Sequence, residues 1–370
     1  MSKKLFVFFT FSHGLGGHSY SITSYYSEFK KNSECLLLNI GLKQSPLNEE
    51  FSGDFFKVSA ISFLRDVRRL CRYAKLNQVT EILCMDNQSY AYLRIVSLLL
   101  KIRIVLVKPG GPNPKRYFPK APTLVNFSYE SDEYFSSSNK HKDCTKYVVS
   151  NRIQRCKTKK YSEALSLLRE RNKFVTLRIS RISEDYLKSL MVTIRAFEDI
   201  SRVISDSCLI IIGVVEDDEC FVKLKKMIEG KNIHLLTDDE HIFKSKEFIH
   251  YCDFYIGCGR SAMEALMYNK ALGVPSDIDD TVIIFNEETA FDIGRVNFSP
   301  RVQIKNYTLD PTKIKTDSVF NQKYFDESLE ISKITEIYVP IFNSAKQERV
   351  TNFLDIILGT AVLYKQILVR

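Results

Sequence analysis

The sequence predicts an α/β fold in which two doubly wound domains face a central cleft. Short apolar runs typical of strands alternate with amphipathic stretches typical of helices along most of the chain. This alternation starts again near residue 174, and a chain of 370 residues is long enough for two domains. The apolar runs are also nearly continuous, which indicates parallel strands buried on both faces.

In the first half, strand-like and helix-like segments follow one another with the spacing of right-handed crossover units. The expected strands are 5–9, 35–40, 81–85, 102–107, 124–128 and 146–150. The expected helices are 19–30, 61–76 and 90–100. We therefore expect a Rossmann-like first domain over residues 1–160.

The second half repeats this organisation. Its expected strands are 174–179, 209–213, 233–236 and 254–257, and its expected helices are 186–204, 220–229, 243–251 and 261–268. We expect a second Rossmann-like domain over residues 161–344, joined to the first through the stretch 151–173, which is rich in Lys, Arg and Ser. Residues 345–370 are expected to form one or two helices that pack back on the first domain.

Charge is distributed unevenly along the chain. Residues 1–160 contain 26 Lys/Arg against 12 Asp/Glu, whereas the remainder contains 27 against 32. Such asymmetry predicts an anionic partner for the first half, and membrane phospholipid and nucleic acid are both candidates. No nucleic-acid-binding motif is present and Trp is absent, so we expect no nucleic-acid partner.

The nine cysteines include no Cys-x-x-Cys pair. An odd, scattered set argues against a disulfide framework and a structural zinc site, and it is typical of a protein of the reducing cytoplasm. The apolar run 5–9 is too short for a signal peptide. The chain has no run of about 20 apolar residues, so we expect no transmembrane helix. No HExxH motif occurs, and we expect no bound metal or cofactor.

The segment 253–266 has the most specific chemical pattern in the chain. A buried strand ends in Gly257-Cys-Gly259, and a helix follows that contains Arg260, Ser261 and Glu264. Free amides at a helix start attract phosphate, Arg260 can add a charge-assisted contact, and a carboxylate such as Glu264 can accept two ribose hydroxyls. The alternative is a tight strand–helix turn with Ser261 as the helix cap.

This segment resembles the donor-binding motif of glycosyltransferase family 4-like proteins, which have the GT-B fold. Glu264-Ala-Leu and Gly273-Val-Pro match the family pattern. The resemblance covers residues 5–290 in the correct order. It includes 174–182, where the family's arginine falls on Arg181 and its lysine on Lys188, and 209–213, where Gly213 lies near the nucleotide. The linking segment 148–151 and the Gly-rich loop 14–17 also match.

The chain departs from the family at three places. The family's Glu-x7-Glu motif places its first glutamate at position 256, where this chain has Ile256, so recognition of the donor sugar must differ. Lys188 lies two residues later than the usual spacing. The family's histidine loop falls on 107–112, which contains no histidine, so Lys108, His13 or His18 would substitute.

Polar and glycine residues after the first-half strands form a second set of candidates. We predict catalytic roles for His18, Lys108 and Asp86, because each follows a strand at its carboxyl end. Glycines of the two turn segments are predicted to form an acceptor and phosphate loop: Gly16, Gly17, Gly110 and Gly111. The alternatives are a solvated loop histidine, a simple Pro-Gly turn, and an Asp86 or Asn87 that caps a helix.

The stretch 63–75 is a basic amphipathic helix. One interpretation is a core-packed helix with a solvated basic face. The other is contact with anionic lipid headgroups, each basic residue contributing roughly 1 kcal/mol near the surface. A lipid-linked acceptor would make such contact useful, so we expect a peripheral protein on the inner face of the cell membrane.

Together these features predict an enzyme that transfers sugar from a UDP- or GDP-linked donor to a hydroxyl of a lipid-linked or growing glycan. The resemblance implies a role in bacterial capsule, O-antigen or lipopolysaccharide synthesis and favours retention of anomeric configuration without a metal. The alternative is a nucleotide-sugar epimerase of the same fold. A dinucleotide-dependent oxidoreductase fits less well, because Ser19 replaces the third fingerprint glycine and no acidic residue ends the second strand.

Overall fold

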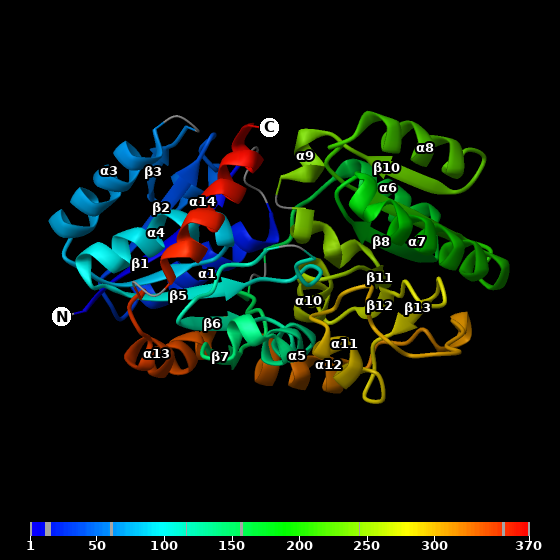
Figure 1. Cartoon of the computed structure of the whole chain (residues 1–370). Helices are drawn as coiled ribbons and strands as arrows, with labels where there is room; N and C mark the ends of the chain where they lie inside the picture. The colour runs from blue at the N-terminus through cyan, green and yellow to red at the C-terminus, as the bar shows by residue number, and fades with distance from the viewer. Residues whose placement is uncertain are drawn as a thin grey trace. The chain divides into compact units, whose positions relative to one another are not determined.

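The chain forms two compact units, one of Met1–Gln154 with Glu330–Arg370 and one of Arg155–Leu329 (Figure 1). The computed structural model describes residues 2–11, 16–59, 62–115, 117–155, 158–243, 245–349 and 352–368. Both units are α/β with sheets that are wholly or mainly parallel, as predicted. Among the described helices, none has the length and apolar character needed to cross a membrane.

The first unit contains a seven-stranded parallel sheet in the order β3-β2-β1-β4-β5-β6-β7. Its strands are β1 (Lys3–Thr10), β2 (Cys35–Gly41), β3 (Asp54–Lys57), β4 (Val79–Cys84), β5 (Arg103–Lys108), β6 (Thr123–Asn126) and β7 (Thr145–Val148). Its helices are α1 (Gly17–Lys30), α2 (Pro46–Glu50), α3 (Phe63–Leu76), α4 (Asn87–Leu100), α5 (Tyr129–Ser137), α13 (Ile334–Ser344) and α14 (Phe353–Leu368), with short turns η1 (Asn139–His141) and η5 (Ile331–Lys333).

Helices cover both faces of this sheet, and strand β1 shows why. Leu5 and Val7 point to the face covered by α3, α4 and α14, whereas Phe6 and Phe8 point to the face covered by α1 and α13. Alternate side chains of a strand face opposite sides of the sheet. Because helices cover both sides, both sets of side chains are apolar. The unit therefore has two hydrophobic cores, one on each side of the sheet.

A buried polar cluster ties the C-terminal segment to α4. Arg94 Nε lies 3.1 Å from Glu348 Oε2, and Arg94 Nη1 lies 2.9 Å from Asp355 Oδ2. Tyr90 donates a 2.6 Å hydrogen bond to the same Glu348 oxygen. The return to the first unit begins at Glu330, earlier than residue 345, because α13 packs its apolar face on α1 in the core of this unit.

The second unit contains a six-stranded sheet in the order β10-β9-β8-β11-β12-β13, in which only the edge strand β13 is antiparallel. Its strands are β8 (Phe174–Ile179), β9 (Ser207–Ile212), β10 (Ile233–Leu236), β11 (Phe254–Ile256), β12 (Ala271–Pro275) and β13 (Val282–Ile284). Its helices are α6 (Glu163–Arg171), α7 (Glu184–Val203), α8 (Asp218–Ile228), α9 (Asp239–Ile242), α10 (Arg260–Met267), α11 (Ala290–Arg295) and α12 (Ser318–Tyr324), with η2 (Ser245–Tyr251), η3 (Pro311–Lys313) and η4 (Phe325–Leu329).

Several elements differ from the sequence-based expectation. The basic stretch 151–173 contains α6, which buries Leu165 and is capped by Ser162. The expected helix 243–251 forms the 3₁₀ segment η2 instead. Strand β3 was not predicted, because its four residues are at most partly buried and show no continuous apolar run.

Candidate functional site

The site in the second unit lies where the strand order reverses. The chain enters at β8, adds β9 and β10 on one side, and then adds β11 and β12 on the other. In open α/β sheets, ligands bind at the carboxyl ends of the strands beside such a reversal. The segment predicted to bind the donor, 257–264, follows β11 at this edge.

Two glycines define the loop between β11 and α10. A Cβ atom on Gly257 would overlap the ring of Tyr255, so only glycine fits there. Gly259 has φ 60° and ψ −135°, a conformation that side-chain-bearing residues rarely adopt, and it precedes the first residue of α10. Its amide donates a 2.6 Å hydrogen bond to the Phe298 carbonyl, which fixes the loop. The helix therefore starts with its amide groups at the carboxyl edge of the sheet.

A fully buried arginine lies beside this loop, and the sequence analysis did not identify it. Arg178, the second-last residue of strand β8, is 0% exposed. Its guanidinium donates to Ser189 Oγ at 3.0 Å, to Cys258 Sγ at 3.2 Å and to the Ile256 carbonyl at 3.5 Å. Its Nε has no hydrogen-bond partner, and no carboxylate of the described residues forms an ion pair with it.

Arg178 is unusual because a buried charge normally has a partner of opposite sign. Strand β11 lies beside it in the sheet, where Tyr255 pairs with Leu177, and its side chain contacts the Ile256 carbonyl and Cys258. The guanidinium thus lies next to Ile256 and the Gly257–Gly259 loop. The signal in the sequence was a lone charged residue near the carboxyl end of an otherwise uncharged strand.

Arg260 and Glu264 form an ion pair on the first turns of α10. Arg260 Nε lies 3.0 Å from Glu264 Oε1, and both side chains are about nine-tenths buried. Ser261 donates a 3.1 Å hydrogen bond to the Cys258 carbonyl and makes no cap bond to the helix. The alternative prediction that Ser261 caps α10 is therefore wrong, because Gly259, two residues before Ser261, occupies the cap position.

Arg181, Lys188 and Gly213 lie around the same sheet edge in different environments. Gly213 directly follows β9, and Arg181 follows β8 with its guanidinium 3.3 Å from Glu216 Oε1 and stacked on the Tyr186 ring. Lys188 instead donates to the Asp277 carbonyl at 2.9 Å and pairs with Asp280 at 3.2 Å. Lys188 is thus bound to the loop after β12.

The first unit also has a reversal of strand order, between β1 and β4. The carboxylate of Asp86 accepts the Phe9 amide at 2.7 Å and the Ser89 amide at 2.6 Å, so it joins the end of β1 to the start of α4. The alternative prediction that Asp86 caps a helix is confirmed. His18 lies at the same place, with Nε2 3.5 Å from the Phe9 carbonyl and 3.4 Å from Ser19 Oγ.

Lys108 holds the turn that follows β5. Its Nζ donates to the carbonyls of Pro109, Gly110 and Gly111 at 2.9, 3.1 and 3.3 Å, and the side chain is buried. The ammonium thus organises the Pro-Gly-Gly segment from inside. Gly111 has φ 88°, as a turn glycine requires.

The Gly-rich loop after β1 is described only at its end. Gly16 precedes the first residue of α1 with extended backbone, and Gly17 is the first residue of that helix. His13 and Gly14, which the sequence analysis also named, lie outside the described residues.

No group of three or more His, Cys, Asp or Glu side chains with metal-binding geometry occurs among the described residues. The loop after β12 contains Asp277 and Asp279, spaced as Asp-x-Asp, but Asp279 Oδ2 accepts the Asn306 amide at 2.9 Å. The sequence-level expectation that the chain contains no Asp-x-Asp pair is therefore wrong.

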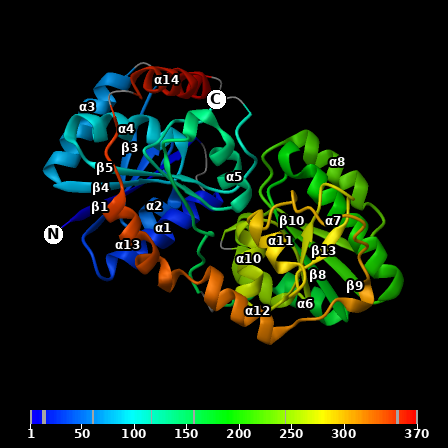
Figure 2. The same ribbon diagram turned by 60° about the horizontal axis from the view of Figure 1, so that its bottom comes forward.

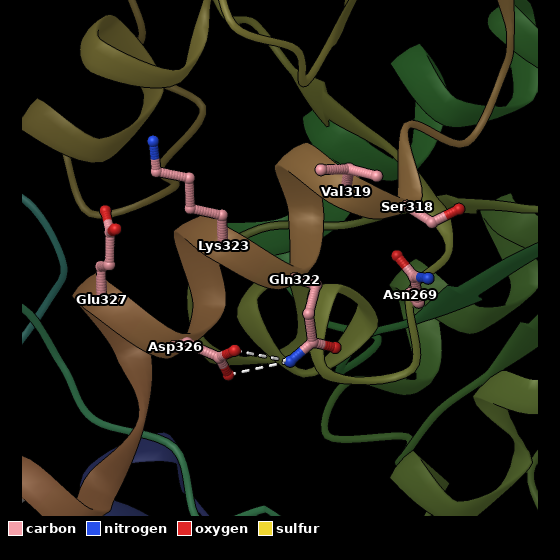
Figure 3. Close-up of a pocket in the computed structure, with 7 residues that line it drawn as sticks. All are labelled: Asn269, Ser318, Val319, Gln322, Lys323, Asp326 and Glu327. Atoms are coloured by element: carbon pink, nitrogen blue, oxygen red, sulfur yellow. Dashed lines mark hydrogen bonds between the residues drawn. The ribbon is translucent and has the colours of Figure 1, made fainter.

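A separate pocket of about 570 Å³ lies between Asn269 and α12–η4 of the second unit (Figure 3). Figure 3 shows Gln322 and Asp326 joined by two hydrogen bonds, of 2.9 and 2.8 Å, in its wall. None of the predicted site residues lines this pocket, so we assign no ligand to it.

Comparison with known proteins gives structural but no sequence matches. Neither a family model nor a curated protein matches the sequence. The structure of Anabaena HepE in complex with UDP-glucose is 14% identical, covers 92% of this chain and 99% of its own, and has a TM-score of 0.66. The apo lipopolysaccharide outer core galactosyltransferase WaaB is 13% identical, covers 92% and 99%, and has a TM-score of 0.55.

The fold also occurs in another class of sugar-nucleotide protein. A putative UDP-N-acetylglucosamine 2-epimerase from Listeria monocytogenes is 12% identical, covers 76% of this chain and 81% of its own, and has a TM-score of 0.51. Likenesses at this level of identity establish architecture. The predicted α/β class with two Rossmann-like units is therefore confirmed, and the chain has the GT-B fold.

Proposed function

We propose that the chain transfers a sugar from a UDP-linked donor to a hydroxyl of a lipid-linked or growing glycan acceptor. The observation that supports this most strongly is the loop Gly257–Gly259 at the strand reversal of the second unit. There, a helix start and a buried cation without a carboxylate partner occur together. Both favour a phosphate group at the same edge of the sheet.

The donor diphosphate would lie over the amides at the start of α10. Arg178, hydrogen-bonded to the Ile256 carbonyl and to Cys258, would add a fixed positive charge close to the phosphates. Arg181 would exchange part of its contact with Glu216 for a phosphate oxygen. Glu264, oriented by Arg260, would accept the ribose hydroxyls.

In the reaction, the bond between the anomeric carbon and the phosphate oxygen breaks, and a bond from that carbon to the acceptor oxygen forms. The leaving diphosphate keeps the electron pair, and the acceptor hydroxyl loses its proton to solvent or a base. Fixed cations and a helix start can stabilise the negative charge of the leaving group, so we propose a metal-independent reaction. Retention of configuration is also proposed, because the family resemblance favours it.

The first unit would hold the acceptor at its own strand reversal. Of the predicted catalytic side chains there, His18 remains the proposed proton acceptor, since Asp86 is bound to two backbone amides. Lys108 would act by shaping the 109–111 turn that, with Gly16 and Gly17, forms the proposed acceptor loop.

The proposed setting is bacterial capsule, O-antigen or lipopolysaccharide synthesis at the inner face of the cell membrane. A lipid-linked acceptor would bring the enzyme to that surface, where the basic first half could contact anionic lipid. The similarity to a lipopolysaccharide galactosyltransferase supports this setting.

Saturation-transfer NMR with UDP-, GDP-, CMP- and ADP-sugars tests the donor assignment. We expect binding of a UDP-sugar that Glu264→Gln and Arg181→Ala both weaken. Arg202→Ala is the control, because Arg202 is an exposed arginine of the same unit paired with Asp199. Binding that ignores the two site variants, or preference for another nucleotide, would overturn the donor assignment.

The second candidate is an epimerase, which the similarity to the Listeria protein favours. The two activities differ in their need for an acceptor. Incubation with UDP-N-acetylglucosamine alone, followed by proton NMR, would show a second anomeric signal from the C2 epimer if the chain were an epimerase. Free UDP formed only on addition of a glycan acceptor would favour transfer.

A further inference from the structure

We propose that α14 and α3 together form a docking surface for an anionic lipid bilayer, in which α14 lies in the plane of the membrane. This surface extends the proposed function by assigning the part of the molecule that meets the membrane. It consists of an exposed apolar stripe on α14 and the exposed basic face of α3, both in the first unit.

The apolar stripe runs along the outer side of α14. The inner side packs Leu363 and Ile367 into the core of the first unit. The outer side exposes four large apolar side chains in the first two turns and a fifth at the C-terminal end: Phe353 (60% exposed), Leu354 (76%), Ile357 (50%), Leu358 (56%) and Leu368 (72%). Single exposed apolar residues are ordinary, but a row of them on one helix face marks a surface that contacts another apolar phase.

Helix α14 lies outside α4, so its outer side is the surface of the unit. Figure 1 and Figure 2 both show α14 over α4, with α3 beside them. Gln88 of α4 hydrogen-bonds Gln366 at 3.1 Å, and the ring of Phe63 on α3 lies 5.9 Å from that of Tyr364 on α14. The basic helix therefore packs beside the C-terminal half of α14, on the same side of the sheet.

The outward faces of both helices contain cations and no carboxylate. On α3 the exposed basic side chains are Arg65, Arg68, Arg69, Arg72 and Lys75. The one acid of that helix, Asp66, is buried and pairs with Arg69. On the C-terminal segment, Glu348 and Asp355 both point inward to Arg94.

This combination of charge and apolar surface fits an anionic bilayer. Apolar side chains would enter the boundary between headgroups and acyl chains, while the arginines of α3 would contact phosphate groups. A second copy of the chain fits poorly, since two such faces would bring like charges together. Because the inner side of α14 is held by α4, the helix can lie along a membrane only with its stripe facing the lipid.

Vesicle co-sedimentation of the full chain tests the proposal. The probes are vesicles of phosphatidylcholine alone and of phosphatidylcholine with phosphatidylglycerol at a 7:3 ratio, with no sugar nucleotide present. We expect binding to the anionic vesicles that falls with added salt. Arg65→Gln/Arg68→Gln/Arg72→Gln should reduce the partition coefficient roughly hundredfold, since each cation near the surface contributes about a factor of five. Leu354→Ser/Leu358→Ser should reduce it by about tenfold or more.

Matched controls come from the second unit. Lys223→Gln/Lys225→Gln/Lys226→Gln on α8 removes three exposed cations, and Val222→Ser/Val319→Ser removes two exposed apolar side chains. Neither control should change vesicle binding, and circular dichroism would verify that all four variants fold. Equal effects of site and control variants, or no preference for anionic vesicles, would overturn the proposal.

Light scattering tests the alternative that a second copy of the chain, and not a membrane, covers this surface. A wild-type dimer that Leu354→Ser/Leu358→Ser converts to a monomer, without any change in vesicle binding, would show that the stripe is a self-association face and would also overturn the proposal. Because neither assay contains a donor, failure of this proposal is independent of failure of the sugar-transfer assignment.

Discussion

Replacing Arg178 by methionine should make the second unit more stable and its donor site weaker. The guanidinium is fully buried without a carboxylate partner among the described residues, and its Nε makes no hydrogen bond. Burial of one ion costs several kcal/mol in a protein, and the bonds to Ser189, Cys258 and the Ile256 carbonyl offset about 2–3 kcal/mol of that cost. Arg178→Met should therefore raise the free energy of unfolding by about 1–2 kcal/mol.

The same substitution should weaken donor binding. A fixed charge about 6 Å from a phosphate, at an effective dielectric constant near 20, contributes about 2–3 kcal/mol. The affinity for UDP should then fall by roughly 30- to 100-fold. Arg178→Lys keeps the charge and should retain most of the affinity, which separates the role of charge from that of shape.

Urea unfolding with and without a fixed excess of UDP measures both quantities, because a ligand that binds only the folded state raises its stability by an amount that depends on the logarithm of ligand concentration over Kd. Arg202→Met, an exposed arginine of the same unit, is the control. The reasoning is refuted if Arg178→Met destabilises the protein as an ordinary core substitution does and leaves the stabilisation by UDP unchanged.

The remaining predictions concern the loop, a buried histidine and the C-terminal segment. Gly259→Ala, at φ 60°, should cost about 1–3 kcal/mol of stability and abolish donor binding. Gly230→Ala, at φ 74° with open space around it, should cost a similar amount in urea unfolding but leave UDP titrations unchanged. Burial, reinforced by Lys140, lowers the pKa of His141 to about 4. The folded state therefore favours the neutral ring, and stability present above pH 6.5 is lost as the pH falls toward 4, by up to about 3 kcal/mol. His141→Gln should remove that part of the acid sensitivity, and unchanged pH dependence of urea midpoints would contradict the assignment. Arg94→Met leaves Glu348 and Asp355 without their shared cation and should cost about 3–5 kcal/mol in the first unit, whereas Arg94→Met/Glu348→Leu should recover part of it. Equal melting temperatures for the single and double variants would argue against this coupling.

The fold could be predicted from the sequence where local pattern decides structure. Strands 174–179 and 233–236 have the expected bounds, because each is a mainly apolar run flanked by polar residues. Helix α6 was missed in the basic stretch 151–173, because only Leu165 of its nine residues is buried and the rest resemble a linker.

The site was less predictable because partners come from distant segments. From the sequence, Asp86 could be either a catalytic residue or a helix cap. Only the pairing of β1 with β4 shows that its Oδ2 also accepts a hydrogen bond from the Phe9 amide. Lys108 resembles a free catalytic cation in the sequence, but it is bound to the turn that follows it. Arg178 became notable only when the structure showed that no carboxylate of the described residues accompanies it.

Amide hydrogen–deuterium exchange with and without UDP is the most direct test of the central claim, that the second unit binds a nucleotide diphosphate at its strand reversal. We predict slower exchange in residues 257–263 on UDP addition, since those amides would gain phosphate oxygens as acceptors. The Gly259→Ala variant should lose this protection. Protection confined to the first unit, or none at any UDP concentration, would contradict the claim.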